Sequence, residues 1–135
     1  MLQLKIITPK RLVLDQEVDS ISCETVDGEI TILPRHTPLL TLLTTGVITV
    51  KTNKEEEYFS AGNGYVETDG QQVKILISRA MDQSELDEKT IIEVKNQAEE
   101  LLQEQKSAED RQKAFAMLRR ATVDLKVIKK LKRKI

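Results

Sequence analysis

The sequence predicts an N-terminal antiparallel β-sandwich or flattened barrel, residues 1–80, followed by a C-terminal antiparallel two-helix hairpin, residues 81–135. Three observations predict this order. Up to about residue 79, apolar side chains recur with a period near two, which is typical of half-buried strands. Glycine and proline interrupt that part at short intervals, and neither occurs after residue 78. Beyond that point the apolar spacing becomes helical.

About eight short strands are expected in the first part, because alternating stretches are separated by turn residues at regular intervals. A Thr8–Arg11 turn, an Asp27-Gly28 pair and an Asp69-Gly70 pair mark three of these intervals. Residues Thr52–Lys54, between two alternating stretches, are typical of a β-hairpin. The stretches with the strand pattern are Leu4–Ile6 with Val13, Val18–Val26, Ile30–Ile32, Pro38–Leu43, Val47–Lys51, Glu55–Ser60, Tyr65–Glu67 and Val73–Ile77.

Residues 28–46 combine several signals. They hold the only histidine and two of the three prolines, and a β-branched run before Pro34 is followed by a second apolar run after Pro38. Because proline fixes φ and cannot donate to a β-ladder, residues 34–38 are expected to form an ordered loop that holds its middle residues outward. A stiff loop suits a contact surface, and it also suits an ordinary turn between strands. From this segment alone both interpretations stay open, with the ordinary turn favoured.

Two amphipathic helices are expected after residue 81. Ser84, with Asp87 three residues on, is typical of a capping box, and Ser107 with Asp110 repeats the signal before the second helix. A short break near residues 105–108 suits an antiparallel αα-hairpin. The apolar stripe of the first helix is Ile91, Val94, Ala98 and Leu101 or Leu102, and that of the second is Ala114, Leu118, Ala121, Leu125 and Ile128. The alanines mark where two helices could approach closely.

Charge divides the two predicted helices. Ten acidic and three basic residues lie between Asp82 and Asp110, a net charge of −7, whereas eight basic residues and one acidic residue lie between Arg119 and Lys134, a net charge of +7. In a hairpin the two helices would attract each other, and a released second helix would present an unpaired basic face. Exposed ion pairs contribute only about 0–1 kcal/mol each, so charge alone would not hold the hairpin closed.

Several kinds of chemistry are excluded. The single cysteine, Cys23, allows no internal disulfide and no paired-thiolate zinc motif, and its place in an alternating stretch predicts a packed thiol. Phosphate-binding and nucleophile motifs are missing, nothing near His36 supplies a nucleophile, and neither a metal nor a cofactor is expected. No apolar run reaches the roughly 20 residues that cross a bilayer, and the N-terminus is no signal peptide. We expect a soluble intracellular protein that is not an enzyme by itself.

In these features the chain resembles the epsilon subunit of rotary F-type ATP synthases. The most specific match is the segment from Gly28 to Leu40, Gly-Glu-Ile-x-Ile-Leu-Pro-x-His-x-Pro-Leu-Leu. The stretches Leu4–Pro9, Gly62–Glu67 and Leu118–Ala121 also match, so that the resemblance spans essentially the whole chain. The helical part is similar mainly in pattern.

The resemblance implies a β-sandwich that joins the rotor by binding the gamma subunit and the c-ring. It also implies a helical hairpin that either folds against the sandwich or extends along gamma toward the alpha/beta head, where it inhibits ATP hydrolysis. The protein would be peripheral to the membrane, on the cytoplasmic face of the bacterial cell membrane, and would bind no nucleic acid. Glu29 would reach the c-ring, and the implied contacts to the c-ring or gamma are Glu29, Arg35, His36, Pro38, Leu39 and Leu40.

The charge of the second helix suggests what the extended hairpin would contact. Its bases are expected to engage acidic surface on the alpha/beta head, because opposite charges attract most strongly at close range. The candidate contacts in the regulatory helix are Arg119, Arg120, Lys126, Lys129 and Lys130.

Some bacterial members of the family bind ATP in the folded hairpin, through an Asp-x-x-Arg-Ala segment at the first helix and arginines on the second. Asp87 and Arg120 match that pattern, whereas Thr90, Ile91 and Asp124 depart from it. An acid that faces phosphates is unfavourable at close range. Weak or absent ATP binding is therefore expected, with Asp87 and Arg120 serving as cap and surface residues.

A different class of function stays open at this point. A free-standing β-sandwich could use the basic helix, residues 119–134, to bind nucleic acid or an anionic membrane surface, although the acidic first helix opposes this interpretation. Binding that falls steeply with salt would favour it. Co-purification with a gamma subunit would favour the rotor interpretation.

Overall fold

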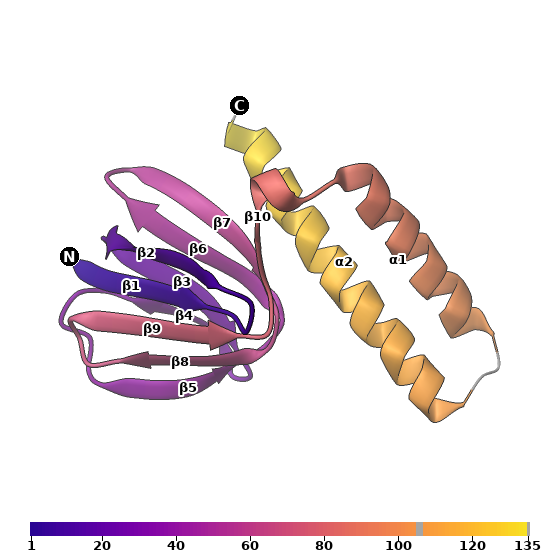
Figure 1. Cartoon of the computed structure of the whole chain (residues 1–135), viewed down its shortest axis with the longest axis horizontal. Helices are drawn as coiled ribbons and strands as arrows, with labels where there is room; N and C mark the ends of the chain where they lie inside the picture. Colours follow the sequence, from indigo (N-terminus) through magenta and orange to yellow (C-terminus); the bar gives the residue numbers. More distant parts are fainter. Residues whose placement is uncertain (105–106, 135) are drawn as a thin grey trace.

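The computed structural model describes residues 1–104 and 107–134. In them a ten-stranded sheet is followed by a short 3₁₀ turn and two helices (Figure 1). The strands are β1 (Leu2–Ile7), β2 (Leu12–Val18), β3 (Ser20–Thr25), β4 (Gly28–Ile32), β5 (Leu39–Leu43), β6 (Gly46–Thr52), β7 (Glu55–Ala61), β8 (Gly64–Thr68), β9 (Gln72–Ile77) and β10 (Ala80–Asp82). The helical elements are η1 (Gln83–Glu85), α1 (Glu88–Gln103) and α2 (Ala108–Lys134).

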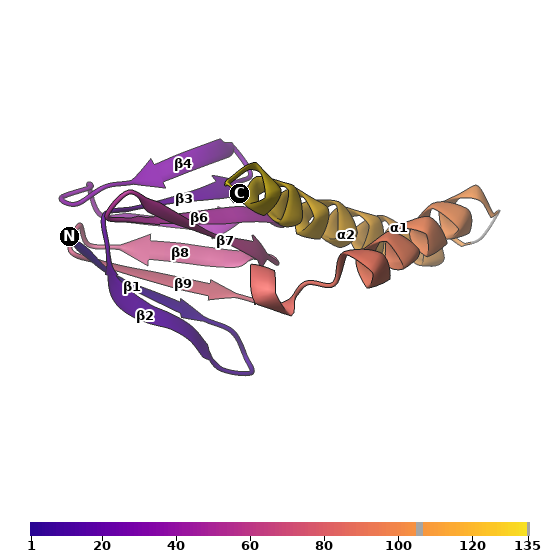
Figure 2. The ribbon, with the colours of Figure 1, turned by 90° about the horizontal axis from the view of Figure 1, so that it is seen from above.

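The strands form one hydrogen-bonded path in the order β10-β7-β6-β3-β5-β8-β9-β1-β2, and β4 pairs with β3 beside that path. β2 also contacts β6, so the path curls over on itself into a nearly closed sandwich. Figures 1 and 2 show the strands gathered at one end of the molecule and the helical hairpin projecting from it. The predicted sandwich followed by a two-helix hairpin is confirmed.

One pairing differs from the predicted antiparallel pattern. β1 and β9 run parallel, with partners from Gln3↔Gln72 to Ile7↔Leu76. The pattern of apolar residues reports which face of a strand is buried, and this pattern is the same for either strand direction. The sequence therefore indicated strands at these positions and could not show that the first and ninth would meet side by side in the same direction.

The predicted hairpin is formed by β6 and β7, which pair from Gly46↔Ala61 to Thr52↔Glu55. The connection is two residues long, because Thr52 belongs to the strand, and both residues of the turn have positive φ, 48° at Asn53 and 72° at Lys54. That conformation is the one whose twist matches the flanking strands. Asn53 N–H also donates to an Asp19 carboxylate oxygen at 2.8 Å, which fixes the turn from outside.

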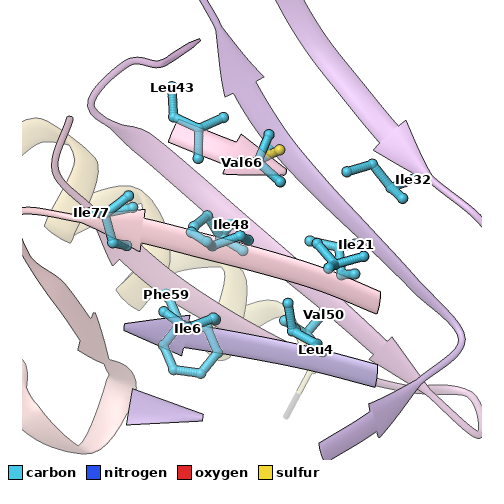
Figure 3. Close-up of a cluster of buried hydrophobic side chains, with 14 of the residues drawn as sticks. Leu4, Ile6, Ile21, Ile32, Leu43, Ile48, Val50, Phe59, Val66 and Ile77 are labelled. Carbon is cyan, nitrogen blue, oxygen red and sulfur yellow. The ribbon is translucent and has the colours of Figure 1, made fainter. Parts of the chain in front are cut away.

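The core is aliphatic, as the scarcity of aromatic residues requires. Phe59 is its one aromatic member (Figure 3). Cys23 also belongs to this core and is fully buried. Burial, together with the nearby carboxylates of Glu29 and Glu24, raises the pKa of the Cys23 thiol to about 12. The packed-thiol prediction is confirmed. The buried residues of this core are Leu2, Leu4, Ile6, Val18, Ile21, Cys23, Ile32, Leu43, Ile48, Val50, Phe59, Ala61, Val66, Val73, Ile75, Ile77 and Ala80.

The helix starts follow the capping signals with one correction. Ser107 Oγ accepts from Asp110 N–H at 3.2 Å, as expected for α2. The cap of α1 is Asp87 itself, whose side chain accepts from Lys89 N–H at 3.3 Å and from the Thr90 hydroxyl at 2.8 Å. The prediction that Ser84 starts this helix is wrong, because the Ser84 hydroxyl donates instead to Asp82 Oδ1 at 2.6 Å within the η1 turn.

α2 buries residues that a single apolar stripe does not explain. Ala114 and Ala121 are buried as predicted, whereas Leu118, Leu125 and Ile128 are only partly so. Val123 and Val127 are also buried, and they form a second, smaller cluster with Val47, Tyr58 and Leu86. α2 therefore has two buried faces, one for α1 and one for the sandwich. The break predicted near residues 105–108 lies between the end of α1 at Gln103 and the start of α2 at Ala108, and its residues 105 and 106 lie outside the described residues.

Candidate interaction surface and helical junction

The loop between β4 and β5, residues 33–38, is held firmly by the β8–β9 turn. Arg35, with φ of 67°, donates its N–H to Gly70 O at 2.8 Å, and His36 N–H donates to Leu33 O at 3.1 Å. Gly70 itself has φ of 95°, and a Cβ there would lie 2.7 Å from His36 O. A side chain at position 70 would push the loop away. The expected ordered loop is confirmed, and the turn that orders it comes from a distant part of the chain.

The side chains of this loop are mostly turned outward. Pro34, Arg35, Thr37 and Pro38 are exposed, while His36 is half-buried with its Nδ1 2.6 Å from Thr37 O. His36 is therefore engaged by its own loop. Because nothing described here places a nucleophile or a metal ligand beside it, we treat the loop as a candidate contact surface.

An exposed apolar surface lies beside this loop on β5. We call Val26, Leu40, Leu42 and Tyr65 the β5 patch. Val26 is 66%, Leu40 68% and Leu42 64% exposed, and with Thr41 and Glu67 the patch lines a shallow hollow of about 630 Å³. Leu40 and Leu42 point to the same face because alternate residues of a strand do so, whereas Leu43 is buried in the core. Contiguous apolar exposure is typical of interaction sites, and the β5 patch is therefore a candidate for one.

Sequence reasoning found only part of this patch. Leu40 was predicted, and Leu39 lies on the opposite, half-buried face of the strand. Val26 and Tyr65 were missing from the predicted contacts, and Leu42 was included only as part of the segment Pro38–Leu43, which the resemblance places near the gamma and rotor contacts. One signal could have singled out Leu42, because the β5 sequence Leu-Leu-Thr-Leu-Leu is apolar at four positions of five and so cannot be explained by a single buried face.

Glu29 and His36 lie at opposite ends of one strand. Glu29 pairs with Glu24 near the start of β4, next to the exposed β3–β4 turn, whereas the residue 33–38 loop follows the end of β4. β5 runs between the same two ends, because Leu39 pairs with Thr68 beside the β8–β9 turn and Leu43 pairs with Thr25. The two predicted contact points therefore flank the β5 patch and do not meet in one site.

The basic residues predicted on α2 are placed at its surface. Arg119, Arg120, Lys126 and Lys129 are exposed, and Lys130 lies with its Nζ 5.2 Å from the centroid of the Tyr58 ring. That geometry is typical of a cation–π contact. The side chains of the remaining predicted bases, residues 132–134, lie outside the described part of the chain.

The residues compared with the ATP-binding pattern surround one hollow. Asp87, Thr90 and Arg120 line a space of about 500 Å³ between α1, α2 and the sandwich. Asp124 also borders it, yet its carboxylate is bound to the Arg79 guanidinium at 2.8 Å and is 4% exposed. Asp124 is thus a buried, paired residue. The sequence reading, which took it for an acid free to face a ligand, is corrected on this point.

These surfaces define a class of protein: a β-sandwich that presents a firm loop and an apolar patch for protein contacts, with a helical hairpin attached. Among the described residues no group of three or more histidine, cysteine or acidic side chains could hold a metal ion. No described helix is long and apolar enough to cross a membrane. Protein binding is what the geometry supports.

Comparison with known proteins identifies the family. The family model for the β-sandwich domain of the ATP synthase delta/epsilon chain matches residues 1–83. The ATP synthase epsilon chain of Herpetosiphon aurantiacus is 39% identical over 95% of this chain and 94% of the relative. That of Psychrobacter arcticus is 35% identical over 97% of this chain and 96% of the relative. The chain belongs to the ATP synthase epsilon family, which confirms the resemblance and the prediction of a subunit that is not an enzyme by itself.

Two solved structures share the fold. A chain of the Euglena gracilis mitochondrial ATP synthase, OSCP/F1/c-ring, aligns with a TM-score of 0.72 at 19% identity and covers 98% of this chain and 80% of that one. A chain of the Tetrahymena thermophila mitochondrial ATP synthase central stalk/c-ring aligns with a TM-score of 0.64 at 14% identity, with coverages of 93% and 94%. At these identities the likeness concerns the fold alone, helices included.

Proposed function

We propose that this chain is a rotor subunit of an ATP synthase, in which residues 1–80 bind the gamma subunit and the c-ring. The β5 patch carries the proposal. Three of its aliphatic side chains, Val26, Leu40 and Leu42, are each about two-thirds exposed, and an exposed apolar surface of this kind needs a partner to cover it. The structures that share the fold belong to central-stalk and c-ring assemblies, which supports the same partners. Proton-driven rotation would pass through a contact of this kind.

The firm loop suits that role physically. A coupling contact that bends would store torque, whereas residues 33–38 are tied to the β8–β9 turn by the backbone hydrogen bond from Arg35 to Gly70. The exposed Glu29 at the other end of β4 offers a charged contact for the c-ring. The protein would then lie at the cytoplasmic face of a bacterial membrane, as its bacterial relatives suggest.

Co-expression with the gamma subunit of the same organism tests the proposal. The full-length chain should co-purify with tagged gamma through gel filtration at physiological salt. If gamma elutes alone while the chain is folded and in excess, the rotor assignment is refuted. Gel filtration of the chain with DNA tests the alternative function, a free-standing binding module. Co-elution of the chain with DNA would favour that alternative over the rotor subunit.

Replacing both Glu29 and His36 with alanine is expected to weaken assembly or coupling. Each substitution removes a contact at one end of β4, and loss of two such contacts should lower retention of the chain on the rotor by about tenfold. Proton pumping by the reconstituted enzyme measures coupling. Glu17→Ala, at an exposed position of β2, is the control. Wild-type pumping by the double variant would remove these residues from the interface.

We also propose that residues 81–135 regulate the enzyme through release of α1 and α2 from the sandwich. Of the two described helices, α2 packs on β6 and β7, and α1 packs on α2, so a small set of contacts keeps the hairpin docked. The exposed bases of α2 would then be free to meet acidic surface on the alpha/beta head. ATP is not the expected ligand of the docked state, because Asp87 already caps α1 and Asp124 is already paired.

A further inference from the structure

The hairpin is joined to the sandwich through the second half of α2. Val123 and Val127 pack against Val47 and Tyr58 of the β6–β7 hairpin, in a cluster separate from the core of the sandwich. Figures 1 and 2 show this half of α2 beside the strands, and the first half, with α1, extending beyond them. The apolar part of the junction is therefore small, and the junction can open without disturbing the main core.

A charged residue lies in the middle of this junction. Asp124, between the two valines, is 4% exposed and meets Arg79, which connects β9 to β10. The two guanidinium nitrogens reach the two carboxylate oxygens, Nη1 to Oδ1 at 2.9 Å and Nη2 to Oδ2 at 2.8 Å. The hydroxyl of Ser60, fully buried in β7, also donates to Asp124 Oδ1, and Arg79 Nη1 lies 3.2 Å from Ser60 Oγ.

Burying this carboxylate constrains where α2 can dock. A buried charge without a partner is strongly unfavourable, and a pair regains its desolvation cost only in good geometry. A bidentate arginine–carboxylate pair supplies that geometry in one relative position of the two groups. If α2 slid by one turn or rotated, Asp124 would be buried against apolar side chains and Arg79 would lose its acceptor. Docking in any other register is thereby disfavoured.

The segment before α1 has its own attachment. Arg11, in the β1–β2 turn, reaches both carboxylate oxygens of Glu85 at 3.0 Å. η1 is thus tied to the sandwich independently of α2. Opening of the junction would leave η1 in place, and the chain between Glu85 and the start of α1 at Glu88 would turn.

We propose that the contact of Asp124 with Arg79 and Ser60 is a latch that selects the docked register of the hairpin and sets how often it is released. The two helices leave together when the latch opens, because their mutual contact lies apart from it. This inference concerns the isolated chain and holds or fails whether or not the chain binds gamma.

Thiol modification of the full-length chain measures release. A Val127→Cys background places a fully buried thiol in the junction, while Cys23, fully buried in the core, reports on the sandwich in the same molecule. Adding Asp124→Asn leaves the Arg79 charge without its carboxylate, and the rate of labelling at position 127 should rise on the order of a hundredfold. Labelling of Cys23 should not change. Asp110→Asn, the same substitution at an exposed position of α2, should change neither rate.

A double-mutant cycle decides whether the two side chains act as one unit. Arg79→Gln alone should also speed labelling at position 127, and Arg79→Gln combined with Asp124→Asn should give less than the product of the two single effects, because no uncompensated charge remains. Equal rates for Asp124→Asn and Asp110→Asn would overturn the latch. Independent effects of Arg79→Gln and Asp124→Asn on the labelling rate would also overturn it. So would an equal rise in the labelling rate of Cys23, because the contact would then stabilise the whole fold and not the junction.

Discussion

Replacing Leu40 and Leu42 with aspartate is expected to abolish stable binding to the gamma subunit while leaving the fold intact. Both side chains are about two-thirds exposed and lie outside the buried core, so the substitutions cost the isolated protein little. At a covered interface each would bury an unpaired carboxylate in place of an apolar anchor, and a central anchor contributes about 2 kcal/mol or more. Titration of tagged gamma with the purified variants should show a loss of about thirtyfold or more in affinity.

Leu12→Asp is the matched control for this prediction. Leu12, at the start of β2, is also largely exposed and does not line the β5 hollow. It should bind gamma as the wild type does, with unchanged thermal stability. If the variant with aspartate at positions 40 and 42 binds gamma as well as Leu12→Asp does, the β5 patch is not the gamma contact. The partner of this apolar surface is then another protein.

Deleting residues 108–135 is expected to raise ATP hydrolysis by the assembled enzyme. The deletion removes α2 with its exposed bases and its packing against the sandwich, so that the basic helix can no longer reach the alpha/beta head. Couplings between regulatory and active sites commonly correspond to about 5-fold to 150-fold, and we expect a rise of about fivefold or more. Initial rates of ATP hydrolysis, with the amount of retained chain verified on gels, measure it.

The deletion exposes a surface that needs its own control. Without α2, Ile91 and Ala98 of α1 lose the partner that buries them. A longer deletion, from residue 88 to the end, removes that surface as well. Both deletions should give the same increase, since both lack the inhibitory helix. Unchanged hydrolysis in both variants would refute the inhibitory role in this chain.

Local features were predictable because their causes are local. The Asn53 turn between two alternating stretches predicted the β6–β7 hairpin, and the Ser107–Asp110 pair predicted the start of α2. The start of the first helix was assigned to Ser84, whereas Ser84 bonds to Asp82 and the helix is capped by Asp87. The sequence shows that a cap is available, and the folded backbone selects which residue uses it.

The contact surface was predictable in outline. The spacing of Pro34 and Pro38 predicted an ordered loop, but the residue that holds it, Gly70, lies more than 30 positions away. The patch required knowledge of which face of β5 is covered, and this depends on strands that are not adjacent in sequence. Glu29 and His36, close in sequence, were separated by the length of β4.

The sequence by itself determined the element types and the division into a β part and a helical part, because periodicity, turn residues and capping signals act over a few positions. The family was indicated separately, by the resemblance of the segment Gly28–Leu40. Tertiary structure alone decided the parallel β1–β9 pair, the presence of Val26 and Tyr65 in the β5 patch, and the role of Asp124. The physical reason is the same in each case. Burial and charge compensation depend on partners brought together by the fold, and Asp124 meets its partner Arg79 only across 45 positions of the chain.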